Sequence, residues 1–488
     1  TDNGKDRYKT NTFCPISLNR TLICSCAFWL LLPYSKCVQI DTPVDISSEN
    51  LLNTPQMKRR LKPEILAPAG SLATLKTAID FGADAVYCGG KAFGMRAAPK
   101  NFSFEDFEQG VAYAHKRDAR VFVTCNILPH SSEVAAMNEY MGQLGEIGVD
   151  ALIVTDIGML MAARSVAPHT DIHISTQAGV TNYQAAQALA QLGAARVVLA
   201  RELDLEAIRM LRANVPDDLE IEAFVHGSMC MAFSGRCLIS QHTTGRDANH
   251  GDCVQACRYK YHVVEEKTPG RFIPVEITDQ GTFLFNSQDM NMVEHVADVI
   301  DAGVTSLKIE GRAKSAYYVA AMANAYKCAV NEYMIQRGFE DQQGNQLQEF
   351  HLSNTSASHV CLPEWIGKEP YKVTHREYST GFYYSDRPAS EAIVTGGYIN
   401  EWRWLGDVLS YNEAERRLYI LAKNKMTPGM PIEFLIPGRA PIAFTLPACG
   451  FWDEKKHNVE EINYPAHEFS FPCSLAVPAG AMIRAKVR

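Results

Sequence analysis

Short apolar runs alternate with longer amphipathic stretches between residues 61 and 335. The short runs are rich in β-branched residues and almost continuously hydrophobic, a pattern typical of strands buried on both faces of a parallel sheet. The eight predicted strands are Glu64–Ala69, Asp84–Cys88, Arg120–Ile127, Asp150–Thr155, Asp171–Ser175, Arg196–Ala200, Glu220–His226 and Thr305–Glu310. The stretches between them, such as those that begin at Leu72, Tyr183 and Met292, have the periodicity of amphipathic helices.

Several junctions between a predicted helix and the next strand repeat one pattern. Gly82, Gly148, Gly193 and Gly303 each stand just past a helix, where a left-handed residue is common. Eight strands with helices between them predict an α/β fold, a (β/α)8 TIM-like barrel over residues 61–335. A doubly wound open sheet is the alternative, and the near-even repetition favours the barrel.

The pattern changes after residue 335. Residues 336–390 are polar and rich in turn-forming phrases, which predicts a linker region. Residues 391–488 contain short alternating runs separated by glycine and proline, which predicts a small C-terminal antiparallel β domain.

Residues 1–60 differ from the rest of the chain. Their apolar run from Leu22 to Leu32 is shorter than the ~20 residues that a membrane span needs. Three interpretations stay open: a signal-peptide core, an organelle transit sequence, or translated upstream sequence with Met57 as the true start. We expect no membrane partner and a cytoplasmic protein, with an organelle as the alternative if the leader is real.

The composition narrows the class of protein. Of the 488 residues, 47% are hydrophobic and 21% are charged, which excludes a disordered or fibrous chain. The net charge of −8 means that a nucleic-acid partner would need a local basic patch. Fourteen cysteines are too few for a disulfide scaffold.

Polar side chains gather at the C-terminal ends of the predicted strands, where barrel enzymes place their chemistry. Some of them could instead cap the next helix, as Asp156 or Asp204 might. As a converging set they predict a site at the barrel mouth. The set is Asn126, Asp156, Gln177, Arg201, Glu202, His226, Glu310 and Arg312.

Four cysteines cluster after the seventh strand, in a predicted insertion over residues 228–262. Cys230, Cys237, Cys253 and Cys257 have the spacing C-x6-C-x15-C-x3-C. Their spacing departs from usual zinc knuckles, so iron–sulfur and zinc both stay open. A radical adenosylmethionine motif is excluded because Lys260 stands where its third cysteine would be.

Basic residues surround these cysteines: Arg236, Arg246, Arg258 and Lys260. They could contact an RNA backbone, with Phe233, Tyr259 and Tyr261 as stacking surfaces. A solvated surface loop is the alternative. The scattered cysteines are expected to pack as small hydrophobic side chains: Cys88, Cys125, Cys328, Cys361, Cys449 and Cys473.

The phrase EAFVHGSMCMAFSGRCLIS at 222–240 resembles the signature of the collagenase-like peptidase family of unassigned catalytic type. The phrases LAPAG at 66–70, GADAVY at 82–87, NSQD at 286–289 and SLKIEGR at 306–312 also resemble that family. The resemblance covers about 60–488. GDCVQACRY at 251–259 and LAKNKMTPGMPIEF at 421–434 are similar to a branch that modifies tRNA.

The resemblance implies oxygen-independent hydroxylation of the tRNA wobble uridine to 5-hydroxyuridine, with prephenate linked to the reaction and the anticodon loop as partner. It also implies a [4Fe-4S] cluster on the four clustered cysteines. For this chemistry the candidate pocket groups at the predicted mouth are His226 as proton relay, Gln177 as base-edge contact, Glu310, and Arg312 as phosphate or carboxylate clamp. Hydroxylation of ribosomal RNA or a quinone, peptidase activity, and a non-catalytic iron–sulfur module are the alternatives. No H-E-x-x-H or G-x-S-x-G motif supports hydrolysis.

Overall fold

The computed structural model describes residues 62–95, 101–230, 232–258, 277–278, 281–282, 288–352, 359–384 and 398–487. The interpretations of residues 1–60 therefore lie outside the described residues. In the described part of the chain, none of the helices combines the length and apolarity that a membrane crossing requires.

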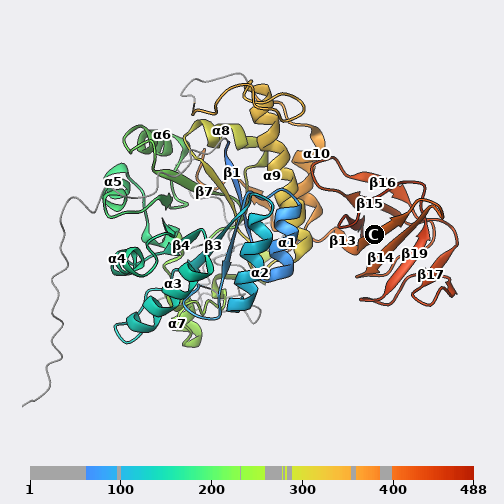
Figure 1. The fold of residues 1–488 in the computed structure, drawn as a ribbon, viewed down its shortest axis with the longest axis horizontal. Coiled ribbons are helices and arrows are strands. Elements are labelled where there is room, and N and C mark those ends of the chain that lie inside the picture. The colour runs from blue at the N-terminus through green and yellow to red at the C-terminus, as the bar shows by residue number, and fades with distance from the viewer. Residues whose placement is uncertain are drawn as a thin grey trace, which may run out of the picture. The chain divides into compact units, whose positions relative to one another are not determined.

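Eight parallel strands close into a barrel (Figure 1). Each strand pairs with the next along the chain, and the last pairs with both the first and the seventh. The TIM-like barrel predicted from the periodicity is therefore confirmed. Its strands are β1 (Glu64–Pro68), β2 (Ala85–Gly89), β3 (Arg120–Cys125), β4 (Ala151–Val154), β5 (Asp171–Ile174), β6 (Arg196–Val198), β7 (Glu220–Ser228) and β11 (Ser306–Ile309).

Helices surround the strands and bury their apolar faces against the sheet. They are α1 (Leu72–Asp80), α2 (Phe104–His115), α3 (Val134–Ile147), α4 (Ile157–Val166), α5 (Tyr183–Gln191), α6 (Leu205–Ala213), α8 (Val296–Asp301) and α9 (Ala316–Gln336). Gly82, Gly148, Gly193 and Gly303 all have positive φ. The glycines predicted past the helix ends thus adopt the left-handed conformation, which an L side chain would disfavour.

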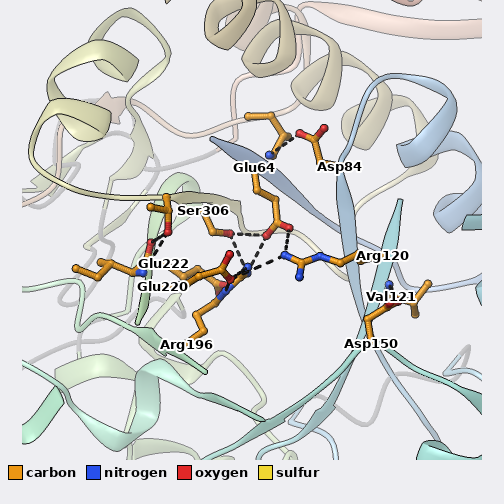
Figure 2. Close-up of polar contacts among 12 residues, drawn as sticks. Glu64, Asp84, Arg120, Val121, Asp150, Arg196, Glu220, Glu222 and Ser306 are labelled. Carbon is orange, nitrogen blue, oxygen red and sulfur yellow. Dashed lines mark hydrogen bonds and ion pairs between the residues drawn. The ribbon is translucent and has the colours of Figure 1, made fainter. Parts of the chain in front are cut away.

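The barrel interior contains a buried network of charges near the N-terminal ends of the strands (Figure 2). Arg196 of β6 is fully buried. It donates hydrogen bonds to Glu64 at 2.7 Å and Glu222 at 2.8 Å, and it also pairs with Glu220. These side chains alternate along their strands with residues that pack on the helices, so the interior is ionic where the sequence pattern suggested only apolar packing.

Two short strands extend the barrel sheet beyond β7. β10 (Asp289–Asn291) pairs antiparallel with β7, and β12 (Tyr378–Ser379) pairs parallel with β10. Residues 336–390, predicted to be a linker, therefore include a strand of the barrel sheet. They also include α10 (Glu364–Lys368) and the 3₁₀ helix η6 (Glu369–Lys372).

The segment between β7 and β10 carries the four clustered cysteines and short helical turns. These are η2 (Phe233–Gly235), α7 (Ile239–Thr244), η3 (Ala248–His250) and η4 (Ala256–Arg258), followed by the two-stranded pair β8 (Ile277–Thr278) and β9 (Gly281–Thr282). Two further 3₁₀ helices, η1 (Thr176–Ala178) and η5 (Val293–His295), follow β5 and precede α8.

The C-terminal part of the chain forms an antiparallel sheet of eight strands, as predicted, with its own apolar core. The strands are β13 (Trp402–Asn412), β14 (Arg417–Ala422), β15 (Pro431–Leu435), β16 (Ile442–Thr445), β17 (Phe451–Asp453), β18 (Asn458–Val459), β19 (Glu468–Pro472) and β20 (Met482–Lys486). Buried Arg484 of β20 joins this sheet to η6 through two hydrogen bonds to Glu369, of 2.6 and 2.8 Å.

Candidate functional site

His226 lies near the C-terminal end of β7, buried at the barrel mouth with 1% exposure. Its Nδ1 lies 3.3 Å from the hydroxyl of Tyr326, and its ring packs against Tyr318 and Tyr378. Its Nε2 has no hydrogen-bond partner among the described residues. Burial lowers the pKa of His226 to about 3, so the imidazole is neutral at physiological pH. A buried, unpaired ring nitrogen is a rare feature that a ligand could satisfy.

Glu310 follows β11 and lies beside His226. Its backbone N–H donates to the carbonyl of His226 at 2.8 Å, and its own carbonyl accepts from the Tyr318 hydroxyl at 2.9 Å. Its carboxylate lies 3.6 Å from the guanidinium of Arg201. The β7–β11 register also shifts at this point, a bulge of the kind found near active sites.

Gly227 makes the close approach of these two strands possible. Its φ is +102°, and a Cβ there would lie 2.7 Å from the carbonyl oxygen of Glu310. Any side chain would therefore be strained and would also press on the backbone of Glu310.

Gln177 and Arg312 occupy other parts of the mouth. Gln177 is buried in η1, where its backbone carbonyl accepts a hydrogen bond of 2.6 Å from Arg236 of the cysteine segment. Arg312 donates to the hydroxyl of Thr124 at the end of β3, at 3.0 Å. The nearby Asn126 donates to Ser175 at 3.2 Å.

Two of the acidic residues at strand ends are helix caps. The side chain of Asp156 accepts a hydrogen bond from the first turn of α4, and that of Asp204 does the same for α6. Glu202 instead accepts two hydrogen bonds of 2.7 Å from Ser234, so it anchors the cysteine segment.

The cysteine segment docks on the same end of the barrel through several polar contacts. Besides the bonds from Arg236 and Ser234, the backbone N–H of Leu128 donates to the carbonyl of Asn249 at 3.3 Å. His250 lies 3.0 Å from the carboxylate of Glu133. The segment of about thirty residues that carries the four cysteines therefore lies at the C-terminal face of the barrel.

The surroundings of the thiols suit metal-bound sulfur. The backbone N–H of Ile239 donates to Cys237 Sγ at 3.3 Å, and that of Gln255 donates to Cys253 Sγ at 3.4 Å. Hydrogen bonds of this kind stabilise thiolates and tune the potential of iron–sulfur centres.

The predicted RNA-contacting residues differ in their exposure and in whether the structure describes them. Arg236 is exposed apart from its bond to Gln177, and Arg246 is exposed but paired with Asp252. Arg258 belongs to η4, and its side chain is not among those described. Lys260, Tyr259 and Tyr261 lie outside the described residues. Phe233 is 50% exposed, as a stacking surface requires.

The scattered cysteines follow the sequence expectation only in part. Cys88, Cys125, Cys328 and Cys473 are buried, and burial raises the pKa of Cys88 to about 12. The expectation is wrong for two others, because Cys361 and Cys449 are exposed. Both lie in exposed loops, so they serve as controls for the clustered thiols.

Sequence reasoning missed the aromatic and ionic wall of the mouth. Tyr318, Tyr326 and Tyr378 surround His226, and burial raises the pKa of each well above 10. Behind them Asp289 is paired with Arg376 at 2.6 Å. Although burial opposes ionisation, the charge of Arg376 lowers the pKa of Asp289. Only the NSQD phrase, which ends at Asp289, pointed to this wall in the sequence.

Comparison with known proteins follows the same division of the chain. The model of peptidase family U32 matches residues 70–392, and that of the family's C-terminal domain matches residues 400–484. The chain is 33% identical over 426 residues to tRNA hydroxylation protein P1 of Bacillus subtilis, covering 87% of this chain and 94% of that protein.

Two further relatives match a little over half of the chain. The tRNA hydroxylation protein P of Helicobacter pylori is 42% identical over 277 residues, covering 55% of this chain and 65% of that protein. The 23S rRNA 5-hydroxycytidine C2501 synthase of Escherichia coli is 39% identical over 275 residues, covering 56% of this chain and 40% of that protein.

Proposed function

The chain belongs to peptidase family U32, and from that membership we propose that it is an RNA hydroxylase whose substrate is the wobble uridine of tRNA. The supporting observation is the relative named as a tRNA hydroxylation protein, which this chain matches over 94% of its length. The relative named as a ribosomal RNA hydroxycytidine synthase supports the broader reaction class. The product is 5-hydroxyuridine, formed by replacing the hydrogen on carbon 5 with a hydroxyl group.

The proposed cofactor is a [4Fe-4S] cluster held by Cys230, Cys237, Cys253 and Cys257. None of the four forms a disulfide, and two of them accept backbone hydrogen bonds at sulfur, which suits a thiolate bound to iron. Replacing the hydrogen on carbon 5 with a hydroxyl group removes two electrons and two protons from uridine plus water, and such a cluster would pass those electrons one at a time to an acceptor. Prephenate is the proposed co-substrate.

The proposed substrate reaches the site without unwinding a duplex. The wobble base lies in the single-stranded anticodon loop, so it can be turned into the barrel mouth at low cost. His226 is the group we assign to the base, as hydrogen-bond partner or as a relay for the proton that leaves carbon 5. Tyr326 and the flanking rings hold its imidazole in place, and its low pKa makes it neutral rather than cationic.

The remaining mouth residues have supporting roles in this proposal. Gln177 would contact the base edge, and its backbone bond to Arg236 links that position to the cysteine segment. Arg312 would hold a phosphate or carboxylate, and Glu310 would fix the geometry beside His226. We place this chemistry in the cytoplasm, where tRNA is modified.

The deciding experiment is mass spectrometry of tRNA nucleosides. The chain is expressed in a bacterial host whose own tRNA lacks 5-hydroxyuridine, as wild type, Cys237→Ala and Cys449→Ala. We expect 5-hydroxyuridine with the wild type and the exposed-cysteine control, and none with Cys237→Ala. Anaerobically purified wild type should be brown and absorb near ~400 nm, and only Cys237→Ala should lose this colour.

The alternatives predict different results. A hydroxylase of ribosomal RNA would leave tRNA unchanged and add a hydroxylated nucleoside to the 23S fraction. A peptidase would digest gelatin in a manner that does not depend on Cys237. A colourless wild-type protein that contains zinc would refute the cluster.

A further inference from the structure

A cavity of about 370 Å³ lies next to the barrel mouth but outside it. It is bounded by the residues that follow β11, the first turn of α9 and the start of β13. Its volume falls within the ~300–1,000 Å³ usual for small-ligand pockets. Neither the sequence motifs nor the proposed catalytic groups account for it.

Aromatic side chains dominate the walls of this cavity. They are Tyr317, Tyr318, Tyr398, Trp402 and Trp404. Among the residues that the structure describes, no aspartate or glutamate lines it, although the chain carries a net charge of −8. Flat aromatic faces without carboxylates suit a ligand that has an aromatic ring and a negative charge.

Two cations lie at the cavity wall. The Nζ atom of Lys314 lies 5.2 Å from the ring centroids of both Tyr318 and Tyr398, and it donates to the carbonyl of Thr374. Arg403 is exposed and makes no ion pair with the described residues. The N-terminus of the long helix α9 adds positive potential at Ser315. Aromatic faces and cations together are the features with which proteins hold an unpaired nucleotide.

Tyr318 connects the cavity to the barrel mouth. One part of this side chain lines the cavity, while its ring lies 6.0 Å from that of His226 and its hydroxyl donates to the Glu310 carbonyl. A ligand in the cavity would thus be separated from the proposed target base by a single side chain.

We propose that this cavity binds an unpaired nucleotide of the RNA substrate that flanks the target base, an inference that rests on the proposed function. The base stacks on the exposed ring of Tyr398 and the adjacent tryptophans. The phosphate faces Arg403 and Lys314. The cavity, and not the cysteine segment alone, then supplies the local positive surface that an acidic protein needs to hold RNA.

Binding of a fluorescein-labelled 17-nucleotide anticodon stem–loop, followed by anisotropy, tests this directly. The variants are Arg403→Glu and Tyr398→Ala, both at exposed positions. We expect each to weaken binding roughly tenfold, within the range measured for loss of one stacked base or one phosphate contact. Arg403→Glu should also lower the slope of log Kd against log salt by about one. Arg439→Glu, at an exposed arginine in the turn between β15 and β16 that does not line the cavity, should stay within twofold of wild type.

A second measurement does not depend on variants. The same RNA with 4-thiouridine at each loop position in turn is cross-linked to the wild type, and the modified peptide is sequenced. A cross-link from a nucleotide next to the wobble position to residues 398–404 supports the proposal. Cross-links confined to other segments, or variants that bind as tightly as wild type, overturn it.

The outcomes also separate this inference from the proposed function. If wild type forms 5-hydroxyuridine while both variants bind RNA normally, the cavity assignment fails and the function stands. If the variants lose binding but wild type never forms 5-hydroxyuridine, the RNA cavity stands and the proposed reaction fails. Loss of prephenate binding in the variants, with RNA binding intact, would reassign the cavity to that co-substrate.

Discussion

Replacing Arg196 with methionine would remove the central cation of the barrel interior. The side chain is fully buried and pairs with three carboxylates, of which Glu64 and Glu222 are also fully buried. Methionine fills a similar volume without charge, so the perturbation is mainly electrostatic. The sequence of β6 offers no other cation in the interior.

The remaining contacts determine the size of the loss. Breaking a buried ion pair by removing one partner costs about 3–5 kcal/mol. Here Glu64 keeps Arg120 at 2.7 Å, and Glu222 keeps Lys308 at 2.6 Å. Glu220 loses its main partner but is partly exposed, so water can solvate it. We therefore expect the unfolding free energy to fall by about 3 kcal/mol, the lower end of that range.

The loss should shrink as the pH falls. Without Arg196 the interior carries an excess negative charge, which raises the pKa of a buried carboxyl above its unfolded value. A carboxyl with a raised pKa stabilises the fold at low pH, and that stability disappears as the pH rises through the folded pKa. His173 adds to the effect, because burial and the charge of Arg196 hold its pKa well below 6.5. Removing that charge allows the imidazole to take up a proton more readily.

Pulse proteolysis in urea at pH 8 and pH 5.5 measures this loss on the full chain. Tryptophan fluorescence would follow mainly the C-terminal sheet, since Trp402, Trp404 and Trp452 lie there. Fragments from the barrel are therefore followed instead. Arg209→Met, at an exposed pair with Glu206, serves as control and should change stability by less than about 0.5 kcal/mol. A loss below about 1 kcal/mol at pH 8, or one that grows toward pH 5.5, would refute the electrostatic reasoning.

Two further changes test the barrel mouth. Gly227→Ala should lower the unfolding free energy by about 2 kcal/mol or more and reduce hydroxylation, because the new Cβ would press on the Glu310 carbonyl. The control is Gly429→Ala, where φ is +70° and the space around the residue is open, so it should cost only the backbone strain and leave hydroxylation intact. Equal effects of the two variants in urea denaturation and nucleoside assays would contradict this. In the wild type, His226 has a pKa of about 3 in the folded state and takes up its proton only on unfolding, so the unfolding free energy falls by up to ~1.4 kcal/mol per pH unit below pH 6.5. His226→Asn removes this proton uptake and should make the fold less sensitive to acid. Urea midpoints between pH 7 and pH 5 would show it, and a slope identical to wild type would exclude His226 as a source.

The sequence predicted the framework of the barrel well because its signals are local. Each strand is a short apolar run, and four helix ends are followed by a glycine whose left-handed backbone the structure confirms. The pairing of β10 with β7 and of β12 with β10 was not predicted. These strands have only three and two residues, too few for any periodicity, and their partners lie far away in the chain.

The interior charges were visible but not interpreted. Glu64, Arg196, Glu222 and Lys308 stand within predicted strands, where a charged residue at every second position marks a polar interior face. The pattern could not show which charges meet, because closure of the barrel brings together residues as far apart as Glu64 and Ser306, which are 2.8 Å apart. The tyrosines around His226 come from α9 and β12 and are likewise joined only by the fold.

The positions of the charges separate stability from chemistry in this barrel. Arg196 and its carboxylate partners lie toward the N-terminal ends of the strands, where their charges balance one another. At the opposite end, His226 keeps a ring nitrogen with no hydrogen-bond partner among the described residues, and Arg236 and Ser234 of the cysteine segment donate hydrogen bonds to the barrel. A segment held by a few polar contacts can gain or lose a cluster without unfolding the barrel beneath it. Loss of the proposed cluster in Cys237→Ala should therefore abolish the proposed hydroxylation while leaving the proteolytic stability of the barrel unchanged. A parallel loss of both would mean that the thiols stabilise the fold itself.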